Sequence, residues 1–238
     1  MRIALIGYGR MGQAIEKLAK ERGHQISMII DKNTEHSIED LSPDNSDALI
    51  EFTNPEVAYD NLHATIASGV PCISGTTGWL DKYNEICTHV KAVNGAFLYA
   101  SNFSIGVNLF FALNQKLAQM MAPQKDYAIS MEEIHHIHKL DAPSGTAITL
   151  AEQIIGHNTT KNKWVNDRVE DSDTIGIVSK RDGEVPGTHS IRYESDIDQI
   201  TITHEAFSRK GFALGAVMAA EWMDGKTGVY TMRDVISI

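Results

Sequence analysis

The stretch RIALIGYGRMG, residues 2–12, decides the fold of the first part of the chain. An apolar run ends there in the motif Gly7-x-Gly9-x-x-Gly12, and the residues that follow carry apolar side chains at helical spacing. In such a turn the first glycine allows the tight bend, the second lets a pyrophosphate approach the backbone, and the third packs the helix against the strand. The helix start also offers unpaired N–H groups to phosphates. We therefore predict a dinucleotide site at Gly7, Gly9 and Gly12.

An acidic residue stands where such a site needs one. Asp31 ends the next expected strand, 19 residues after Gly12, where a carboxylate can accept hydrogen bonds from the hydroxyls of the adenosine ribose. This position favours NAD(H). Lys32 follows at once and can pair with a 2′-phosphate, so NADP(H) stays open. The simpler alternative is a plain strand-to-helix turn, with Asp31 only ending a strand.

Short apolar runs alternate with amphipathic segments through the first hundred residues. This alternation is typical of strands joined by crossover helices, and it predicts a Rossmann-like, doubly wound parallel sheet of the α/β class. The expected strands are residues 2–7, 26–31, 48–53, 70–76 and 96–101, and the expected helices are residues 11–21, 55–68 and 79–93.

The pattern changes after residue 102. Two alternating runs, 174–181 and 188–194, flank a turn-rich connection, which indicates an antiparallel pair. We predict a dinucleotide-binding domain formed by residues 1–103 and 212–238, and an inserted α+β sheet domain, residues 104–211, for substrate binding and oligomerisation. The other expected elements are helices 107–121, 146–155 and 212–223, strands 127–134 and 200–207, and an irregular stretch over 158–173.

Composition narrows the function classes. With 238 residues, 42% of them hydrophobic, the chain can form a sizeable core. The 21 basic and 31 acidic residues give a net charge of −10, which repels a nucleic-acid backbone. Two cysteines are too few for a disulfide framework, and Arg2 and Arg10 stand where an export signal would be apolar. Polar residues break the longest uncharged run, 92–115, so we expect a cytoplasmic protein with no membrane or nucleic-acid partner.

A second informative stretch is EEIHHIHKLDAPSGTA, residues 132–147. Ser144, Gly145 and Thr146 follow a proline at the start of an expected helix, so free N–H groups and two hydroxyls converge there. Such a point suits a carboxylate. Lys139 adds a positive charge close by and can also donate a proton.

Two other interpretations of this stretch compete. His136 and His138 alternate on one strand face, as two imidazole ligands of a metal would. A further ligand could come from Glu132, Glu133 or Asp141, but no second dense cluster of ligand-type residues accompanies them, and we expect no metal. The stretch could also be a capped helix start with histidines on the surface.

The run from His135 to Ala147 resembles the dihydrodipicolinate reductase family of the bacterial diaminopimelate and lysine pathway. Five shorter motifs fit the same family in order along the chain: Gly9 to Gly12, Glu51 to Thr53, Gly75 to Gly78, Ala100 to Phe103 and Ser208-Arg209. The resemblance implies NAD(P)H-dependent reduction of 4-hydroxy-tetrahydrodipicolinate to tetrahydrodipicolinate, in a homotetramer built through the sheet domain.

The resemblance also implies roles for particular residues. His135 and Lys139 are the implied catalytic positions, with Lys139 as the proton donor. The implied substrate-binding residues, besides Lys139, are His136, Ser144, Gly145, Thr146 and Thr77. The implied cofactor-binding residues are Gly7, Gly9, Arg10, Met11, Gly12, Asp31, Lys32, Phe52, Gly75, Thr76, Thr77, Ala100, Ser101, Asn102 and Phe103.

Three features depart from the family pattern. The stretch from Asp31 to Asp47 is short, Asn54 stands where an arginine is frequent, and the glycine turn is one residue tighter than Gly-x-Gly-Gly-Arg-Met-Gly. Two rival functions stay open: another two-domain amino-acid dehydrogenase, and a dinucleotide sensor without catalysis. Substrate-dependent oxidation of NADH separates an enzyme from a sensor.

Overall fold

A computed structural model of the chain describes residues 1–169 and 171–238. The described residues form two compact units. The first unit consists of Met1–Ile105 and Lys210–Ile238, and the second consists of Gly106–Arg209. Within the described ranges no helix has both the length and the apolar character needed to cross a membrane.

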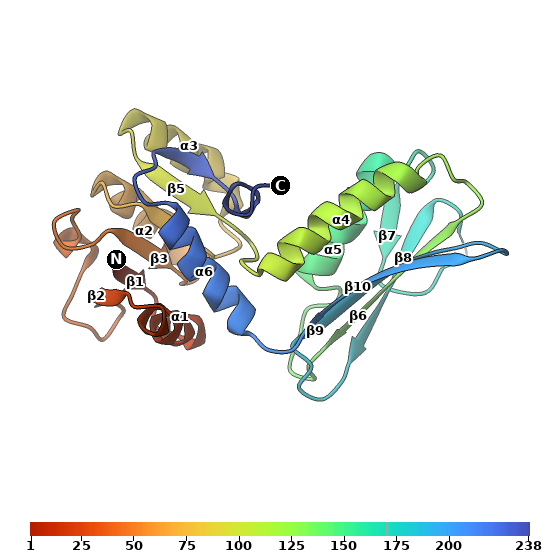
Figure 1. The fold of residues 1–238 in the computed structure, drawn as a ribbon, viewed down its shortest axis with the longest axis horizontal. Helices are drawn as coiled ribbons and strands as arrows, with labels where there is room; N and C mark the ends of the chain where they lie inside the picture. Colours follow the sequence, from red (N-terminus) through yellow and green to blue (C-terminus); the bar gives the residue numbers. More distant parts are fainter. Residues whose placement is uncertain (170) are drawn as a thin grey trace. The chain divides into compact units, whose positions relative to one another are not determined.

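A six-stranded, wholly parallel sheet forms the centre of the first unit (Figure 1). Its strand order is β11-β5-β4-β3-β1-β2, which confirms the predicted doubly wound parallel sheet. The strands are β1 (Arg2–Ile6), β2 (Gln25–Ile30), β3 (Ala48–Glu51), β4 (Cys72–Ser74), β5 (Ala96–Tyr99) and β11 (Gly228–Tyr230). The helices are α1 (Arg10–Glu21), α2 (Pro55–Ala67), α3 (Tyr83–Ala92), α6 (Lys210–Trp222) and α7 (Met232–Val235), with 3₁₀ turns η1 (Ile38–Asp40) and η2 (Leu80–Lys82).

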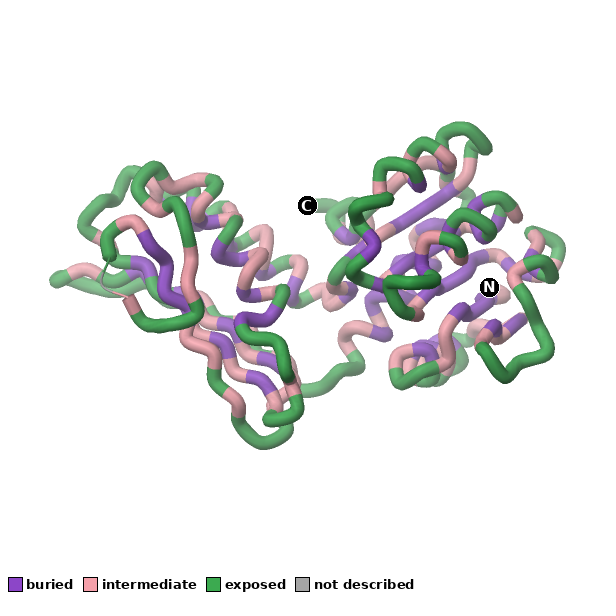
Figure 2. Tube along the Cα trace, turned by 180° about the vertical axis from the view of Figure 1, so that it is seen from behind, coloured by how far each residue is buried: buried purple, intermediate pink, exposed green. Residues whose placement is uncertain are grey.

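Both faces of this sheet are covered, which explains why its strands are continuous apolar runs. Along β1, Ile3 and Leu5 pack in the core that α1 and α6 complete, whereas Ala4 and Ile6 pack in the core that α2 and α3 complete. The inner strands β1, β3, β4 and β5 are accordingly almost wholly buried, whereas the edge strands β2 and β11 are more accessible (Figure 2). Small residues of α6 allow it to approach closely: a Cβ on Gly215 would stand 1.8 Å from the carbonyl oxygen of Phe103.

The second unit is a five-stranded mixed sheet with two helices packed on one face (Figure 1). Its strand order is β10-β9-β6-β8-β7. On β6 the alternate residues Ile129 and Met131 face the helices, and Glu133 and His135 continue the same buried row. The elements are β6 (Ala128–His135), β7 (Lys163–Val165), β8 (Thr174–Arg181), β9 (Gly187–Glu194), β10 (Gln199–Ala206), α4 (Ile105–Met121) and α5 (Gly145–His157).

One pairing prediction was wrong. The runs 174–181 and 188–194 form β8 and β9, but these strands do not pair with each other, because β6 lies between them. β8 is parallel to β6, and β9 is antiparallel to it. An alternating pattern indicates a strand without specifying its neighbour, and the connecting turn alone suggested the hairpin.

Short elements were also missed. β7 lies inside the stretch 158–173, which we expected to be irregular; residue 170 of that stretch is outside the described residues. β11 and α7 follow the closing helix, where no element was expected. The expected helix 79–93 begins at Tyr83, because residues 80–82 form η2 and the Trp79 indole donates to the Thr76 carbonyl at 2.7 Å.

Candidate active site

The first unit has a pocket of about 400 Å³ at the carboxyl ends of β1, β2 and β3. β1 lies between β2 and β3 in the sheet, and the crossover helices α1 and α2 cover opposite faces. Ligands of doubly wound sheets bind at such a switch point. Five of the predicted residues line the pocket: Gly7, Gly9, Asp31, Lys32 and Phe52. Asn54, Val57 and Asn61 also line it and were not predicted.

The three motif glycines have different structural roles. Gly7 has a φ of +87°, and a Cβ there would stand 2.0 Å from the Phe52 carbonyl oxygen. A Cβ on Gly12 would stand 2.3 Å from the Gly7 carbonyl oxygen, so both positions exclude a side chain. A Cβ on Gly9, in contrast, would have no described atom within 4 Å. Gly9 therefore leaves room for a ligand in front of α1.

The start of α1 fits a pyrophosphate. Gly9 is its N-cap and supplies no side-chain hydrogen bond, and the first turn has no acidic residue. Among the described residues no acceptor takes the N–H groups of Arg10 and Met11. Unpaired N–H groups at the positive end of a helix bind phosphate well.

The side chain of Asp31, which follows β2, is hydrogen-bonded to the backbone of the glycine turn. Its Oδ2 accepts from the Tyr8 N–H at 2.6 Å, and its Oδ1 accepts from the Lys32 N–H at 2.7 Å. Each carboxylate oxygen keeps a second lone pair that can accept from a ribose hydroxyl. The structural and the ligand-binding interpretations of Asp31 are therefore compatible, and the exposed Lys32 stands beside it.

A buried carboxylate at the end of β3 was missed as a site organiser. Glu51 is fully buried and accepts hydrogen bonds from the Thr53 N–H at 3.0 Å, from Ser74 Oγ at 2.7 Å and from Thr76 Oγ1 at 2.6 Å. The hydroxyl of Thr53 also donates to it. Glu51 thus joins the loops that follow β3 and β4. An acidic residue ending an otherwise apolar strand was the signal that could have identified it.

The predicted residues after β4 and β5 lie in several environments. The side chain of Thr76 is buried and turned toward Glu51, whereas Thr77 is exposed. A Cβ on Gly75 would stand 2.1 Å from the Phe52 ring, so Gly75 makes room for that ring. None of the predicted residues after β5 lines the pocket, among the residues described: Ala100 and Phe103 are buried, Ser101 is exposed, and Asn102 accepts from the Ser104 N–H at 2.9 Å.

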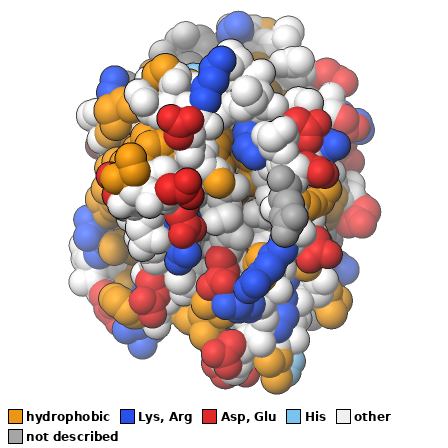
Figure 3. Space-filling model, turned by 90° about the vertical axis from the view of Figure 1, so that its right-hand side faces the viewer, with side chains coloured by type: hydrophobic (Ala, Val, Ile, Leu, Met, Phe, Trp, Pro, Cys, Tyr) orange, Lys and Arg blue, Asp and Glu red, His pale blue; other side chains and the backbone are white. Residues whose placement is uncertain are grey.

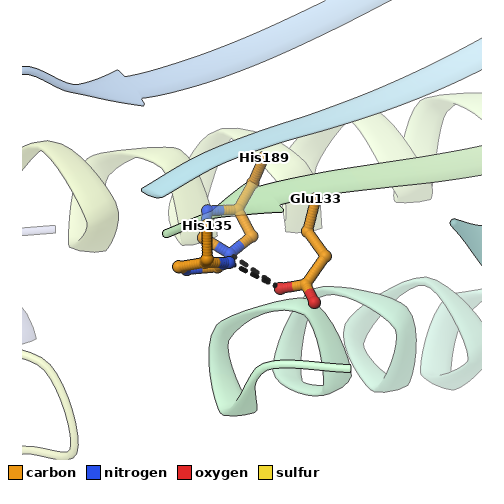
Figure 4. Close-up of side chains that lie close together, drawn as sticks. All are labelled: Glu133, His135 and His189. Atoms are coloured by element: carbon orange, nitrogen blue, oxygen red, sulfur yellow. Dashed lines mark ion pairs between the residues drawn. The ribbon is translucent and has the colours of Figure 1, made fainter. Parts of the chain in front are cut away.

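In the second unit a polar cluster gathers at the end of β6 (Figure 4). Nδ1 of His135 lies 3.0 Å from Oε2 of Glu133, and Nε2 of His189 lies 3.9 Å from the same oxygen. The Ser144 N–H donates to this oxygen at 3.2 Å, and Ser144 Oγ lies 3.1 Å from Nε2 of His189. All four side chains are buried.

Burial and close contacts together set the charge of this cluster. Burial lowers the pKa of His189 to about 4, so that imidazole is neutral near pH 7. Burial acts to raise the pKa of Glu133, but contacts with His135 and Ser144 outweigh it and hold that pKa well below its usual range. The cluster therefore holds an ionised carboxylate against two imidazoles.

The lysine of the motif lies in the loop between β6 and α5. Lys139 Nζ donates to both carboxylate oxygens of Asp141 at 2.8 Å. Arg181 holds the same loop, because its Nε donates to the Lys139 carbonyl at 3.1 Å and its Nη2 to the Asp141 carbonyl at 2.6 Å. The Lys139 side chain keeps 21% of its surface exposed.

The start of α5 presents donors as predicted from the motif, but not all of the expected ones. Ser144 is the N-cap: its Oγ accepts from the Ala147 N–H at 3.2 Å and its own N–H is taken by Glu133. Among the described residues the N–H groups of Gly145 and Thr146 donate to no acceptor. These two groups are the ones that can receive a carboxylate.

The histidines that suggested a metal do not form the tightest ligand-type group. His136 and His138 have ring centroids 6.1 Å apart, and His138 faces Glu184 at 3.4 Å. Glu133, His135 and His189 instead offer ligand atoms within 4.8 Å of one another. The Arg181 guanidinium lies 3.3 Å from the second oxygen of Glu133, where it opposes a further cation, so we base no function on a metal.

Two family models match the chain in turn. The model described as dihydrodipicolinate reductase, N-terminus, matches residues 1–103, and that described as dihydrodipicolinate reductase, C-terminus, matches residues 106–236. The chain belongs to the dihydrodipicolinate reductase family.

Curated members of this family are similar along the chain. The 4-hydroxy-tetrahydrodipicolinate reductase of Christiangramia forsetii is 53% identical over 240 residues, which cover 100% of this chain and 98% of that one. The enzyme of the same name from Neisseria meningitidis serogroup B is 40% identical over 200 residues, covering 81% of this chain and 73% of that one.

Solved structures show the same fold. A dipicolinate-bound dihydrodipicolinate reductase from Paenisporosarcina sp. TG-14 has a TM-score of 0.78 at 21% identity, with 98% of each chain covered. A probable dehydrogenase from Thermotoga maritima has a TM-score of 0.57 at 11% identity, over 99% of this chain and 92% of that one. At these identities the likeness concerns the fold alone.

His189 and Arg181 of this dihydrodipicolinate reductase family member were missed by the sequence analysis. They lie about 40 residues or more beyond the histidine motif and reach Glu133 only because β8 and β9 flank β6. A histidine or arginine in an alternating strand is usually a surface residue. The sequences of β8 and β9 therefore did not indicate that these two residues belong to a site. Glu133 appeared only as a possible metal ligand.

Proposed function

We propose that this chain reduces 4-hydroxy-tetrahydrodipicolinate to tetrahydrodipicolinate with NAD(P)H, a step of diaminopimelate and lysine biosynthesis. The reaction removes water from the hydroxylated ring and adds one hydride and one proton to the conjugated imine, so atoms and charge balance. The relative that is 53% identical along the whole chain carries the name of this activity. The family's two domains and the Rossmann-type sheet support the use of a nicotinamide dinucleotide.

The observation that carries the proposal is the arrangement at the end of β6. His135, Lys139 and the unpaired N–H groups of Gly145 and Thr146 come from one strand end, the loop after it and the helix start that follows. A dicarboxylate needs a cation and backbone donors to hold it, and an imine needs a proton donor when it is reduced. This stretch supplies both.

The residues around the end of β6 bind, protonate and orient the substrate in the proposed reaction. The N–H groups of Gly145 and Thr146 bind one substrate carboxylate at the positive end of α5. Lys139 pairs with the substrate and gives up an Nζ proton to the ring as the hydride arrives, leaving a neutral amine. His135 orients and polarises the ring beside it. His136 and the Ser144 cap complete the substrate-binding residues of the second unit.

The first unit provides the cofactor site in this proposal. When bound, NAD(P)H supplies the hydride from its nicotinamide ring. The start of α1, with Gly9, Arg10 and Met11, binds the pyrophosphate, and Asp31 with Lys32 binds the adenosine ribose. The wall of this cofactor site is formed by Gly12, Phe52, Gly75 and Thr76. Ala100, Ser101, Asn102 and Phe103 belong to the nicotinamide end.

We also propose dual use of NADH and NADPH, a cytoplasmic location and a homotetramer. Asp31 beside Lys32 rejects neither form of the ribose strongly. Two free cysteines, Cys72 and Cys87, fit a reducing compartment. β10 is an edge strand of the second unit's sheet and has exposed apolar neighbours, which a second copy can cover. Acidic, basic and apolar side chains are mixed on the face that Figure 3 presents.

An assay coupled to the synthase that forms the substrate tests the proposal. NADH or NADPH is supplied in turn, and oxidation is followed at 340 nm, roughly the usual absorbance maximum of a reduced nicotinamide. Oxidation that requires both the synthase and its substrates supports the reductase. Cofactor binding without substrate-dependent oxidation identifies a sensor instead, and oxidation with a different amino-acid-derived imine identifies another dehydrogenase.

A further inference from the structure

A buried ion pair joins the ends of β6 and β8. Oε1 of Glu133 lies 3.3 Å from Nη1 of Arg181, and the Glu133 side chain is completely buried. In the parallel register of these strands Arg181 stands beside His135, so the pair runs diagonally across the sheet end. Burying an ion pair is costly unless further hydrogen bonds satisfy both partners. The additional contacts of each partner therefore indicate its role.

The second oxygen of Glu133 contacts the groups that handle substrate. Oε2 lies 3.0 Å from Nδ1 of His135 and accepts from the Ser144 N–H at 3.2 Å. The opposite ring nitrogen of His135, Nε2, lies beside Gly187, where a Cβ would approach it to 3.0 Å. The carboxylate of Glu133 therefore faces Nδ1 of the buried ring, and the missing side chain of Gly187 leaves space beside Nε2.

Arg181 contacts the backbone of the lysine loop. Its Nε donates to the Lys139 carbonyl at 3.1 Å and its Nη2 to the Asp141 carbonyl at 2.6 Å. A planar guanidinium can make these two bonds and the ion pair with Glu133 at once, whereas an ammonium cannot span the same three positions. The side chain thus fixes both ends of the segment that carries the Lys139 side chain.

From these contacts we infer that Glu133 and Arg181 are positioning residues, which hold His135, Lys139 and the start of α5 in one rigid arrangement. Neither residue needs to touch the substrate. Glu133 holds the imidazole and the helix start, and Arg181 holds the lysine loop. The inference rests on the proposed function, because the groups it positions are those assigned to the reduction. A displacement of about 1 Å at such groups can cost about 10²-fold in rate.

The chain contains a matched control pair. Glu132 and Lys180 are the sequence neighbours of Glu133 and Arg181 on the same two strands. They also form an ion pair, at 2.6 Å, but the Lys180 side chain is 50% exposed and the Glu132 side chain 37%, and Glu132 lies on the face of the sheet away from the helices. Glu132→Gln and Lys180→Met remove the same kinds of charge from the same strands without touching the cluster at the end of β6.

The experiment compares Arg181→Lys and Glu133→Gln with Lys180→Met and Glu132→Gln in the full chain. Reductase kcat, substrate KM and the dissociation constant of NADH are measured, together with hydrogen exchange of the β6, β8 and β9 amides. We expect kcat/KM to fall about 10²-fold in the first two variants, with amide protection kept and NADH binding within about twofold of wild type. Glu133→Gln should also change the pH profile of kcat, which Arg181→Lys should leave in place.

Other outcomes distinguish a failure of the proposed function from a failure of the positioning inference. If wild type and both control variants show no substrate-dependent oxidation, the proposed function has failed and the positioning pair is not at issue. If wild type is active and Arg181→Lys stays within about threefold of Lys180→Met, the inference is overturned. A loss of activity that is accompanied by lost protection of β6 and β8 also overturns it, because Arg181 then only stabilises the sheet.

Discussion

Lys139 and Asp141 form a bidentate ion pair, in which Nζ of the lysine lies 2.8 Å from each of the two carboxylate oxygens. The hydrogen bond from Lys139 lowers the pKa of Asp141, so the carboxylate stays ionised through neutral pH. A substrate carboxylate that binds Lys139 has to compete with Asp141. The two residues therefore need separate variants when the role of the lysine is tested.

The first prediction concerns Lys139 itself. Lys139→Met keeps much of the side-chain length but removes the charge and the proton, and we expect kcat/KM to fall by about 10²–10⁴-fold, as for a positioned general acid. The dissociation constant of NADH should hardly change. Asp141→Asn breaks the same ion pair but keeps the lysine, and it should retain activity to within about tenfold. If Lys139→Met keeps more than about a third of wild-type kcat/KM, the proposed mechanism is wrong.

The second prediction separates two motif glycines. A Cβ on Gly9 meets no described atom within 4 Å, so Gly9→Ala should leave the melting temperature unchanged and still weaken NADH binding by about tenfold or more. Gly12→Ala places a Cβ 2.3 Å from the Gly7 carbonyl oxygen and should lower both stability and binding. Calorimetry of cofactor binding and thermal unfolding measure the two effects. Unchanged NADH affinity in Gly9→Ala would place the pyrophosphate elsewhere.

The third prediction concerns cofactor choice. With Asp31 and Lys32 side by side at the pocket, we expect the affinities for NADH and NADPH to differ by less than about a thousandfold. Lys32→Met should weaken NADPH binding several-fold and leave NADH binding in place. Titration of both cofactors against wild type and variant gives the answer. A larger ratio in wild type means that one of the two side chains does not face the ribose.

The fourth prediction follows from the buried His189. Its pKa is about 4 in the folded state against 6.5 ordinarily, so between these values the unfolded chain binds more protons than the folded one. The free energy of unfolding should therefore fall as the pH drops from 6.5 to 4, by about 3 kcal/mol from this residue at roughly 1.4 kcal/mol per pH unit. Denaturant titrations across this range should show a shallower fall for His189→Gln. Replacing the exposed His36 in the same way should change nothing.

The fifth prediction concerns assembly. The exposed residues Ile197, Ile200 and Phe207 lie at or next to the edge strand β10, where a second copy can cover them. Light scattering at micromolar concentration should give about four times the chain mass of 26.3 kDa. Ile200→Lys should shift the mass toward smaller species, while Leu80→Lys, at an exposed site of the first unit, should not. A 26.3 kDa species in wild type contradicts the tetramer.

Much of the first unit could be predicted because its strands are covered on both faces. Runs such as Ile3 to Ile6 have no alternation, and glycine and acidic residues stand at the strand ends where the ligand pocket forms. The two three-residue strands β7 and β11 could not be predicted in this way, since periodicity needs more residues than they have.

The candidate site was predictable where it is local in sequence. His135, Lys139 and the helix start at Ser144 lie within one short stretch, so their proximity follows from chain connectivity. His189 and Arg181 reach the same cluster through strand pairing. The wrong β8–β9 hairpin hid that relationship, because it separates β9 from β6 and moves His189 away from Glu133.

The order of synthesis matters for this fold because the sheet of the first unit takes its last strand, β11, and its covering helix α6 from beyond the second unit. A growing chain that has emerged as far as Tyr99 still exposes to water the apolar face over which α6 later packs. About a hundred further residues must leave the ribosome before that face is closed. Chains that end just after Arg209 keep the second unit's own core yet present an open sheet to their neighbours, so we expect such prematurely ended copies to be prone to aggregation.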